Sequence, residues 1–456
     1  MDNDINRIQE QIQFCISGES WGGLPALLDQ LHPADIADVI EASPDEVHNR
    51  IFDLLDDETK ADVMAELDDS TEAELLEELT SEEISDIAEE MAPDDAADML
   101  SELDEERSEE VLELMEEEDS EEVRELLSYD EESAGGRMTT DLVALPSTQT
   151  AKEALDHIGS LDLDEPVYFA YVIDAAEKLL GYVQIWQMLK AENRQKTLGE
   201  LAEETTFTAL PDTDQEEVAQ TMSKYDLSSL PVVDEAGKLL GRITIDDVVD
   251  VIQEEASEDI FKIAGSDDIE LEDPSPLASC KARLPWLLVT LVAGFISSLI
   301  LKRFIDNPQI IMLSAFVPII MAMGGNTGIQ SSILIVRGLA LGTFDERQLH
   351  RLLVHELLTG MMMGVVCGGI IGVWARFMVG THGQFSPLYL ATTVGLALFC
   401  AMMFAAAFGA FVPLLLNRYK IDPAVAAGPF VTASNDVMAL LIYYGITFLL
   451  ISLRVA

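Results

Sequence analysis

Basic residues are scarce in this sequence. Its 456 residues include 26 Lys and Arg against 84 Asp and Glu, which gives a formal charge of −58 at pH 7. The phosphate groups of nucleic acids and of anionic lipids are bound by basic surfaces, and this chain has little basic surface to offer. Nucleic acid is therefore excluded as a partner, and cations are the expected partners.

Cysteine is scarce as well. The four cysteines lie far apart, with neither the paired spacing of a metal site nor the pattern of a disulfide framework. The first four residues lack the basic and then apolar pattern of a secretory signal. We therefore expect the acidic region to stay in the cytoplasm, so that the rest of the chain must supply its own membrane insertion.

Charge is distributed unevenly along the chain. Residues 276–456 carry 6 acidic and 11 basic residues, whereas the preceding part carries 78 and 15. The rear part contains five apolar stretches of spanning length, about 20 residues each, near residues 285–301, 310–341, 352–379, 388–416 and 424–453. Seven Lys and Arg of this part fall in turns on one side of the membrane and four on the other. Because Lys and Arg are retained on the cytoplasmic side, these numbers predict a cytoplasmic N-terminus and a C-terminus outside.

The second apolar stretch is unusual for a lipid-facing helix. After Pro318 it contains the glycine-rich and polar sequence Met-Gly-Gly-Asn-Thr-Gly-Ile-Gln at residues 323–330. We predict a break in the helix there, since freed backbone groups are tolerated in a membrane only where they are buried or line a cavity. The carbonyl oxygens of Gly324 or Gly325 would then be open to a cation. A close approach of two helices is the alternative.

Asp436 lies deep inside the fifth apolar stretch, where a charged group costs roughly 2.5 to 3.5 kcal/mol on insertion scales. We predict that it lines an ion pathway; a structural, hydrogen-bonded aspartate is the alternative. Hard oxygen ligands suit magnesium or calcium. Because one carboxylate is little charge for a divalent cation, a homodimer that brings two copies of Asp436 to one axis is the expected assembly.

The dipeptide His355-Glu356 begins like the metalloprotease pattern His-Glu-x-x-His but lacks the second histidine. Zinc therefore has no site there, and we place Glu356 at a helix start near the cytoplasmic face. No cluster of nucleophile, base and orienting residue is recognisable elsewhere in the sequence, so we do not expect an enzyme.

Residues 1–132 are predicted to form an all-α, superhelical domain. Apolar residues recur at helical spacing, as at Ile84 and Ile87. Ser43 and Thr80, each followed three residues later by Glu, have the sequence of capping boxes. The motif Pro-x-Asp-x-Ala-Asp at residue 33 recurs at residue 93, which indicates a duplicated helical unit.

A second repeat follows at residues 133–198 and 199–245. In both copies an apolar run leads through a turn to a second apolar run, which predicts helix, strand, turn, strand and helix. Residues 230–251 closely resemble the regulatory module of the cystathionine-β-synthase (CBS) type. Such modules associate in pairs, and the resemblance implies that the pair senses adenine nucleotides or ions.

The second copy also contains Gly241-x-x-Thr244-x-x-Asp247, which matches the ribose-contacting pattern of nucleotide-binding CBS modules. The first copy has Gln184 and Gln187 instead. By this resemblance Thr244 and Asp247 are candidate contacts of ATP as a regulatory ligand. The alternative is that Thr244 only caps the following helix.

Residues 246–275 are predicted to form an acidic connecting helix. Four carboxylates at helical spacing form a stripe, with two more beside it: Asp247, Asp250, Glu254 and Glu258, then Glu255 and Asp259. Each like-charge pair of this kind destabilises an isolated helix by roughly 0.2 to 0.5 kcal/mol, and a bound divalent cation reverses the sign. We therefore predict cation sites on this helix; an exposed acidic linker is the alternative.

The order of these parts, ending in a five-helix transmembrane domain at residues 276–456, resembles the MgtE family of magnesium channels over essentially the whole chain. The most specific pieces are Gly-Gly-Asn-x-Gly-x-Gln from residue 324, Asp-Pro-Ala from residue 422, and Asp436. The resemblance implies a multi-pass homodimer in the cell inner membrane, with membrane lipid and divalent cations as partners. It places the pore on the two-fold axis and makes the connecting helix a plug beneath it.

The resemblance also implies site residues and a mechanism. The pore ion-binding residues are Asp436, Thr432, Gly324, Gly325 and Asn326. The regulatory magnesium ligands are Asp62, Asp94, Asp98, Asp226, Asp247, Asp250, Glu255, Glu258 and Asp259. The implied function is magnesium uptake through a channel that closes when Mg²⁺ binds the acidic cytoplasmic domains. A channel or carrier for cobalt, nickel or calcium, and a membrane-anchored CBS-type sensor, are the alternatives.

Overall fold

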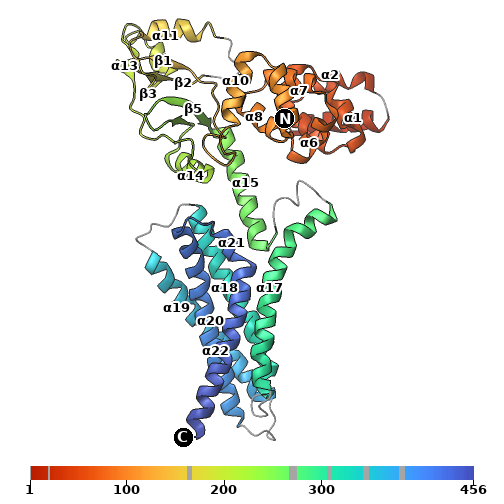
Figure 1. The fold of residues 1–456 in the computed structure, drawn as a ribbon, viewed down its shortest axis with the longest axis vertical. Helices are drawn as coiled ribbons and strands as arrows, with labels where there is room; N and C mark the ends of the chain where they lie inside the picture. Colours follow the sequence, from red (N-terminus) through yellow and green to blue (C-terminus); the bar gives the residue numbers. More distant parts are fainter. Residues whose placement is uncertain are drawn as a thin grey trace. The chain divides into compact units, whose positions relative to one another are not determined.

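The computed structural model describes residues 2–18, 21–161, 167–266, 275–305, 311–341, 349–378 and 386–455. The chain divides into two compact units, Met1–Ile252 and Gln253–Ala456. Figure 1 colours the first unit from red to green and the second from green to blue. Helices dominate both units, and the strands all belong to the first.

The first unit begins with a helical domain. Its helices are α1 (Asp2–Ser17), η1 (Trp21–Gly23), α2 (Pro25–Leu28), α3 (Pro33–Glu41), η2 (Asp45–Val47), α4 (His48–Phe52), α5 (Asp57–Met64), α6 (Asp69–Glu78), α7 (Ser81–Glu90), α8 (Pro93–Ser101), α9 (Glu105–Leu114) and α10 (Glu117–Leu126). Most pack on the next helix but one, as α3 on α5, α5 on α7, α7 on α9 and α8 on α10. This stacking is the superhelical arrangement predicted from the apolar periodicity.

Local sequence signals set several helix boundaries here. The Thr80–Glu83 capping box is confirmed, because each side chain bonds the other residue's backbone N–H at the start of α7. The capping box predicted at Ser43 is wrong: its hydroxyl donates to the carbonyl of Val39 at 2.6 Å, in the preceding helix. The two repeated prolines, Pro33 and Pro93, open α3 and α8, where a missing N–H costs nothing.

Two α/β modules follow. The first contains β1 (Ala144–Pro146), α11 (Ala151–Ile158), β2 (Phe169–Ile173), β3 (Leu179–Gln184) and α12 (Ile185–Leu189). The second contains α13 (Leu198–Leu201), α14 (Gln215–Tyr225), β4 (Ser229–Val233), β5 (Leu239–Thr244) and α15 (Ile245–Ala264). β1 is parallel to β2, and the hairpins β2–β3 and β4–β5 are antiparallel. The predicted order of helix, strand, turn, strand and helix is thus confirmed in both copies.

The core of the helical domain continues into the second module. Met138, Leu230 and Val248 are buried in the same apolar cluster as the helical domain's core residues. The first module has a separate core around Val172 and Val183. The second module is therefore the part of the pair that is packed directly on the acidic helices.

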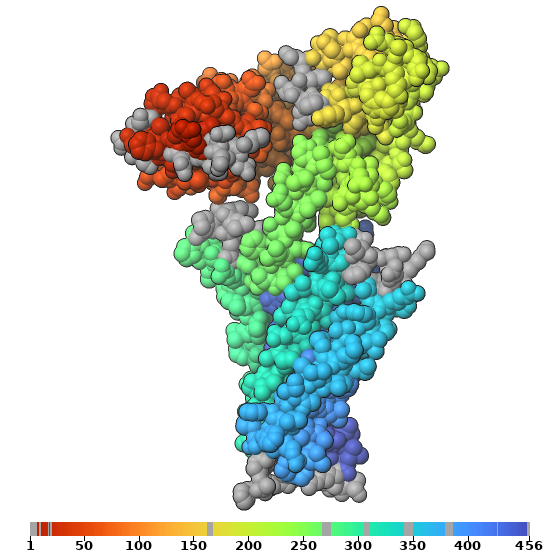
Figure 2. All heavy atoms as spheres, turned by 180° about the vertical axis from the view of Figure 1, so that it is seen from behind, coloured from red at the N-terminus to blue at the C-terminus, as the bar shows by residue number. Residues whose placement is uncertain are grey.

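The second unit is a bundle of long apolar helices. They are α17 (Pro276–Ile305), η3 (Ile311–Phe316), α18 (Val317–Ala340), α19 (Leu349–Met378), α20 (Pro387–Arg418), α21 (Ala424–Ala427) and α22 (Pro429–Val455). Within the described residues, five helices are long and apolar enough to span a membrane. Large apolar side chains such as Val365, Trp374 and Phe377 are exposed on α19, which lies on the face shown in Figure 2.

The break predicted in the second apolar stretch is wrong. α18 runs without interruption through residues 323–330, and Pro318 lies in its first turn. An unbroken helix keeps every backbone group hydrogen-bonded, and glycines in a membrane helix let neighbouring helices approach closely. The interruption lies instead in the fifth stretch, where Gly428 separates α21 from α22.

Residues 267–274 of the predicted connecting helix lie outside the described residues, as do the ends of some predicted spans. The described part of that segment is α15, a single helix of 20 residues. It carries the whole predicted carboxylate stripe from Asp247 to Glu258 on one continuous helix.

Candidate cation sites

Asp436 faces a surface of α18 that consists of glycine. A β-carbon added to Gly325 would lie 3.4 Å from Asp436 Oδ1 and 3.4 Å from Thr432 Cγ2, and one added to Gly324 would lie 3.2 Å from Ala439. The half-buried Asp436 has no hydrogen-bond or ion-pair partner in the part of the chain that the structure describes. The structure therefore brings together Asp436, Thr432 and Gly325, places Gly324 against Ala439 instead, and gives no support to a hydrogen-bonded structural aspartate.

The other predicted pore residue of α18 points elsewhere. Asn326 is exposed, whereas Gly324 and Gly325 are buried against α22. Because α18 is unbroken, the carbonyl oxygens of both glycines lie within the helical hydrogen-bond pattern and are not freed by a break. The absence of a side chain is what lets Gly325 lie close to Asp436 and Gly324 close to Ala439.

The C-terminal end of α15 packs on the short helix α21 and the start of α22. A β-carbon on Gly428 would lie 2.3 Å from the carbonyl oxygen of Ile263, so only glycine fits at this contact. Gly265, with φ of +76°, lies close to Pro429 and Trp286. Ile263 itself packs against the small apolar cluster that contains Val336. The acidic helix thus contacts the segment that leads into the Asp436 helix.

This contact contains a cation that sequence reasoning missed. Lys262 forms ion pairs with Glu258, one turn earlier on α15, and with Asp422 at 2.8 Å. Burial alone would lower the pKa of Lys262, but the hydrogen bonds to Asp422 and Glu258 raise it. Burial, the nearby Asp422 and Glu258 raise the pKa of Asp259 to about 6, although Lys262 opposes the shift. Three carboxylates therefore share one ammonium group.

A second carboxylate contact lies in the first unit, between the helical domain and α15. Asp94 is 8 % exposed, and its Oδ1 has no hydrogen-bond partner among the described residues. Burial and the charge of Asp247 raise the pKa of Asp94. Burial also raises the pKa of Asp247, whose Oδ2 accepts hydrogen bonds from the Thr244 backbone at 3.0 Å and hydroxyl at 2.6 Å. A buried and a half-buried acid whose charges interact are suited to share a proton or a cation.

Arg137 is the basic residue beside this contact. Its guanidinium pairs with Asp98 at 3.3 Å and donates to Gln215 at 3.0 Å. Burial raises the pKa of Asp250, and the charge of Arg137 opposes that shift. Asp94, Asp98, Asp247 and Asp250 are therefore gathered around one region of the first unit.

Sequence reasoning missed a further acidic cluster on α6 and α8. Burial raises the pKa of Glu72 to about 8, with contributions from Glu102, Asp69 and Asp98. Glu72 could not be singled out from the sequence, because acidic residues occur throughout this region and its burial results only from the packing of the helices. Glu72 is consequently protonated near neutral pH.

The remaining predicted regulatory ligands are dispersed. Asp62 and Asp226 are exposed, and Asp226 caps α14 in the left-handed conformation with φ of 52°. Glu255 is half-buried on α15. Among the described residues, no three His, Cys, Asp or Glu side chains converge in a geometry that could hold a metal ion.

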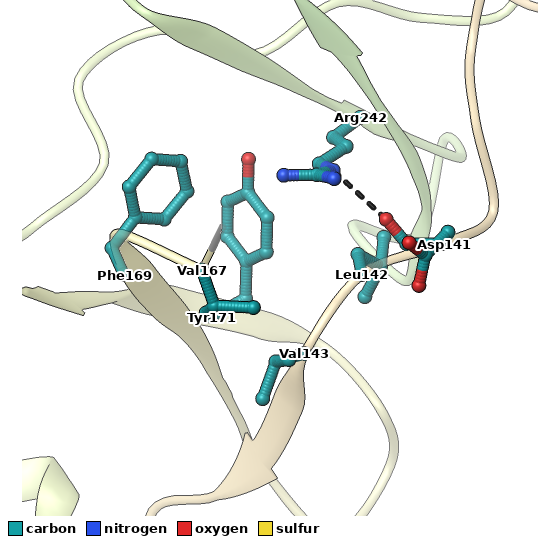
Figure 3. A pocket seen from close by; sticks show the side chains of 7 residues that line it. All are labelled: Asp141, Leu142, Val143, Val167, Phe169, Tyr171 and Arg242. Atoms are coloured by element: carbon teal, nitrogen blue, oxygen red, sulfur yellow. Dashed lines mark hydrogen bonds between the residues drawn. The ribbon is translucent and has the colours of Figure 1, made fainter. Parts of the chain in front are cut away.

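The candidate nucleotide residues bond each other, since the Thr244 backbone N–H and hydroxyl both donate to Asp247 Oδ2 at the start of α15. A small pocket lies nearby between the two modules, lined by Asp141, Leu142, Val143, Val167, Phe169, Tyr171 and Arg242. Figure 3 shows the Arg242 guanidinium beside the Tyr171 ring and bonded to the Asp141 carbonyl, at 2.8 Å. The pocket is only large enough for about one water molecule.

Glu356 is more deeply placed than predicted. It is 5 % exposed within a candidate span of α19, and its carboxylate accepts a hydrogen bond from Ser331 of α18 at 2.7 Å. His355 contacts the other carboxylate oxygen at 3.2 Å. Unlike Asp436, this carboxylate is fully engaged by its neighbours.

The fold and these sites define a multi-pass membrane protein of the divalent cation transporter class, with an acidic helical domain and paired CBS modules. The family model of MgtE divalent cation transporters matches residues 317–446, that of the MgtE intracellular N domain matches residues 31–132, and that of the CBS domain matches residues 198–254. The chain belongs to the MgtE family, as its resemblance implied. This is a family of transporters, not of enzymes.

Similar proteins cover most of the chain. The magnesium transporter MgtE of Thermus thermophilus is 36% identical over 328 residues, 71% of each chain, and that of Bacillus subtilis is 33% identical over 70% of each. A crystal structure of the cytosolic domain of the Mg²⁺ channel MgtE with ATP is 32% identical, with a TM-score of 0.50 over 53% of this chain and 99% of that one. The soluble part of a magnesium transporter is 26% identical, also with a TM-score of 0.50, over 55% and 99%.

Proposed function

We propose that this protein is a magnesium-selective channel for magnesium uptake across the cell inner membrane, and that it closes when Mg²⁺ binds its acidic cytoplasmic domains. The carrying observation is Asp436, a carboxylate inside a membrane span with no partner among the described residues and with glycine on the facing helix. An unpaired intramembrane carboxylate is expected to serve an ion pathway. The 36% identical relative named a magnesium transporter supports the choice of ion.

The proposed assembly is a homodimer with the pore on its two-fold axis. A single Asp436 provides one negative charge, so two copies are needed to balance Mg²⁺. Magnesium dehydrates reluctantly, and a pore can hold the hydrated ion through its waters. Thr432, Gly324 and Gly325 would border that hydrated ion beside Asp436, and Asn326 would join them only from its exposed position. Entry is downhill, since a negative-inside membrane contributes about 2.3 kcal/mol per charge per 100 mV.

The proposed gate is the connecting helix α15, acting as a plug. Its end packs on Gly428 and Pro429 at the start of the Asp436 helix. At low Mg²⁺ the carboxylates at the Asp94–Asp247 contact repel one another; at high Mg²⁺ bound ions would hold the closed form. The unpartnered Oδ1 of the buried Asp94 fits a cation ligand. Shifting a gate from 1:99 to 99:1 takes about 5.5 kcal/mol, so several sites must act together.

The proposed regulatory ligands are those implied by the family resemblance: Asp62, Asp94, Asp98, Asp226, Asp247, Asp250, Glu255, Glu258 and Asp259. Among the described residues no three of these acids converge in a metal-binding geometry, which is consistent with sites completed by other ligands in the dimer. The proposed domains are residues 1–132, 133–198, 199–245, 246–275 and 276–456, with the N-terminus cytoplasmic and the C-terminus outside.

ATP is the proposed regulatory nucleotide. ATP would enter between the modules only if the small pocket there widens, and Arg242, Tyr171 and Phe169 would then line its site. A relative's cytosolic domain has been crystallised with ATP. Thr244 and Asp247 would contact the ribose only after their mutual hydrogen bonds rearrange.

Flux in proteoliposomes tests the proposal. Mg²⁺ flux is measured for the parent and for Asp436→Ala at low and high Mg²⁺ on the cytoplasmic side, with Ca²⁺ and Co²⁺ as competing ions. We expect the parent flux to fall as Mg²⁺ rises and the variant to lose selective flux. Unchanged flux in Asp436→Ala removes this carboxylate from the pore. A preference for Co²⁺ or Ca²⁺ assigns another cargo, and no flux in the parent favours the anchored sensor.

A further inference from the structure

Asn435, the residue before Asp436, is a buried polar group to which the proposed function gives no role. It is 1 % exposed, and neither its Oδ1 nor its Nδ2 has a hydrogen-bond partner among the described residues. Burying an amide without partners costs free energy, and a small apolar residue would avoid that cost. Its position on α22 therefore needs an explanation other than stability.

The Asn435 amide lies directly on Gly328 of α18. A β-carbon added to Gly328 would lie 1.8 Å from Nδ2 and 3.0 Å from Cγ of Asn435, so no other residue fits there without displacing the amide. Gly328 is also held from a second side, because a β-carbon on Gly409 of α20 would lie 2.2 Å from the Gly328 carbonyl oxygen. Helices α20 and α22 thus both contact α18 at Gly328, and neither can move closer to it.

The Asp436 contact lies next to this one, one turn earlier on α18 and one residue later on α22. Gly325 faces Asp436 Oδ1 and Gly328 faces Asn435, so two glycines on α18 contact two consecutive residues of α22. Consecutive side chains of a helix move together when the helix rotates about its axis. Whatever fixes the rotation of α22 at Asn435 therefore also fixes the direction of the Asp436 carboxylate.

We propose that Asn435 is a positioning residue for Asp436: its amide, seated on Gly328 and backed by Gly409, sets the rotation of α22. This inference rests on the proposed function, because it takes Asp436 as the pore carboxylate. A rotation of about 20° displaces a side-chain end about 5 Å from the helix axis by about 2 Å. Such a displacement alters how the carboxylate meets a hydrated ion, and so alters selectivity more than folding.

The test uses size exchange across the contact. The full chain is prepared as the parent, Gly328→Ala, Asn435→Ala and the Gly328→Ala/Asn435→Ala double variant, and the ratio of Mg²⁺ to Ca²⁺ flux is measured in proteoliposomes. Gly445→Ala is the matched control, since a β-carbon at this site on α22 meets nothing within 4 Å. Thermal unfolding in detergent is recorded for every variant.

We expect Gly328→Ala to lower the flux ratio at least about tenfold, because even a 1 Å misplacement is costly in a site that depends on geometry. Asn435→Ala should lower the flux ratio less, because α22 is then free to rotate but is not pushed into a new orientation. The double variant should regain most of the parent ratio, since the new methyl group occupies the space of the lost amide. If Gly328→Ala does not fold, recovery of both folding and ratio in the double variant supports the same contact.

Two outcomes overturn the inference. One is a folded Gly328→Ala protein with the parent ratio. The other is a folded double variant that stays as unselective as the single ones, since the amide would then act by its polarity and not by its shape. If the parent carries no Mg²⁺, or Asp436→Asn keeps selective flux, the proposed function itself fails. If the parent carries Mg²⁺ and Asp436→Asn loses selective flux, but the Gly328→Ala and Asn435→Ala variants keep the parent flux ratio, only the positioning role is refuted.

Discussion

Acidic groups lie in opposite surroundings in the helical domain of the first unit and at the α18–α22 contact of the second. In the first unit carboxylates lie beside other carboxylates, as Asp94 beside Asp247 and Glu72 beside Glu102. In the second, Asp436 faces glycine and has no partner among the described residues. Crowded acids respond to the concentration of cations, whereas a single accessible acid provides a place for one ion at a time. Under the proposed function, the first arrangement would sense Mg²⁺ and the second would conduct it.

The largest effect is expected from neutralising the single acid. Asp436→Asn should reduce selective Mg²⁺ flux at least about 100-fold, which corresponds to about 2.7 kcal/mol. The matched variant is Glu356→Gln, which changes a carboxylate in another span that already accepts a hydrogen bond from Ser331. It should keep flux within about threefold of the parent, because an amide oxygen can accept the same bond. Equal losses in both variants would show that any carboxylate in the bundle matters, and the comparison would fail.

Lys262 tests whether a fixed cation holds the acidic end of α15 in place. Lys262→Met leaves Glu258, Asp259 and Asp422 without their ammonium group. Flux at low Mg²⁺ should rise several-fold and should still close at saturating Mg²⁺. The control is Lys152→Met, an exposed lysine on α11. Unchanged flux at low Mg²⁺ would show that this ion-pair network does not bear on the gate.

Asp94→Asn removes one charge from the buried carboxylate pair of the first unit. Because burial and Asp247 raise the pKa of Asp94, the ionised pair is unfavourable in the absence of Mg²⁺. The variant should unfold at a higher temperature without Mg²⁺ and gain less stability when Mg²⁺ is added. Thermal unfolding of the full chain in detergent, with and without Mg²⁺, measures both effects. Glu113→Gln, an exposed acid on α9, should behave like the parent; a Mg²⁺ response that survives in Asp94→Asn contradicts the assignment.

Glu72 should make stability depend on pH. Its pKa rises from 4.5 to about 8 in the folded protein, so the unfolded chain loses this proton first as pH rises. Glu72 therefore lowers the free energy of unfolding progressively between pH 4.5 and pH 8. Glu72→Gln should unfold at a higher temperature than the parent at pH 8, and the two should converge near pH 4.5. A difference that does not change with pH would exclude this titration.

The smallest effect is expected at a helix start. Thr80→Ala removes the side-chain half of the α7 capping box and should cost about 1 kcal/mol of stability. Ser43→Ala is a useful comparison, because that hydroxyl bonds the end of α3 and caps no helix start. Thermal unfolding of the first unit within the full chain measures both. A Thr80→Ala protein as stable as the parent would show that the cap is redundant with packing on α5 and α9.

Local patterns predicted much of the fold. Helical spacing indicated the core positions of α7, since Ile84 and Ile87 are both buried, and length with hydropathy indicated the five membrane-span candidates. The two repeats predicted the paired modules and the duplicated start of α3 and α8. These features are local or periodic, so they can be read from residue order alone. Ser43 shows the limit, because its partner was a carbonyl four residues earlier instead of the following turn.

The candidate site was only partly predictable. Asp436 stood out by itself, because a charge within an apolar run is conspicuous. The role of the glycines did not: composition suggested a broken helix, whereas α18 is intact and its glycines face Asp436 and Asn435. A glycine-rich stretch can be either an intact helix that packs closely on its neighbours or an interrupted helix. Backbone groups in a membrane must stay hydrogen-bonded, but which of the two forms meets this requirement depends on the neighbouring helices.

The sequence by itself determined the class of each part: an acidic helical region, two α/β modules, an acidic helix and five apolar helices. These properties follow from composition and from periods of two and 3.6 residues, which act over short distances. Only the tertiary structure decided which acids meet, that Lys262 lies between Glu258 and Asp422, and that Asn435 rests on Gly328. Such contacts join residues far apart in the chain, and their burial and charge depend on packing that no local pattern records.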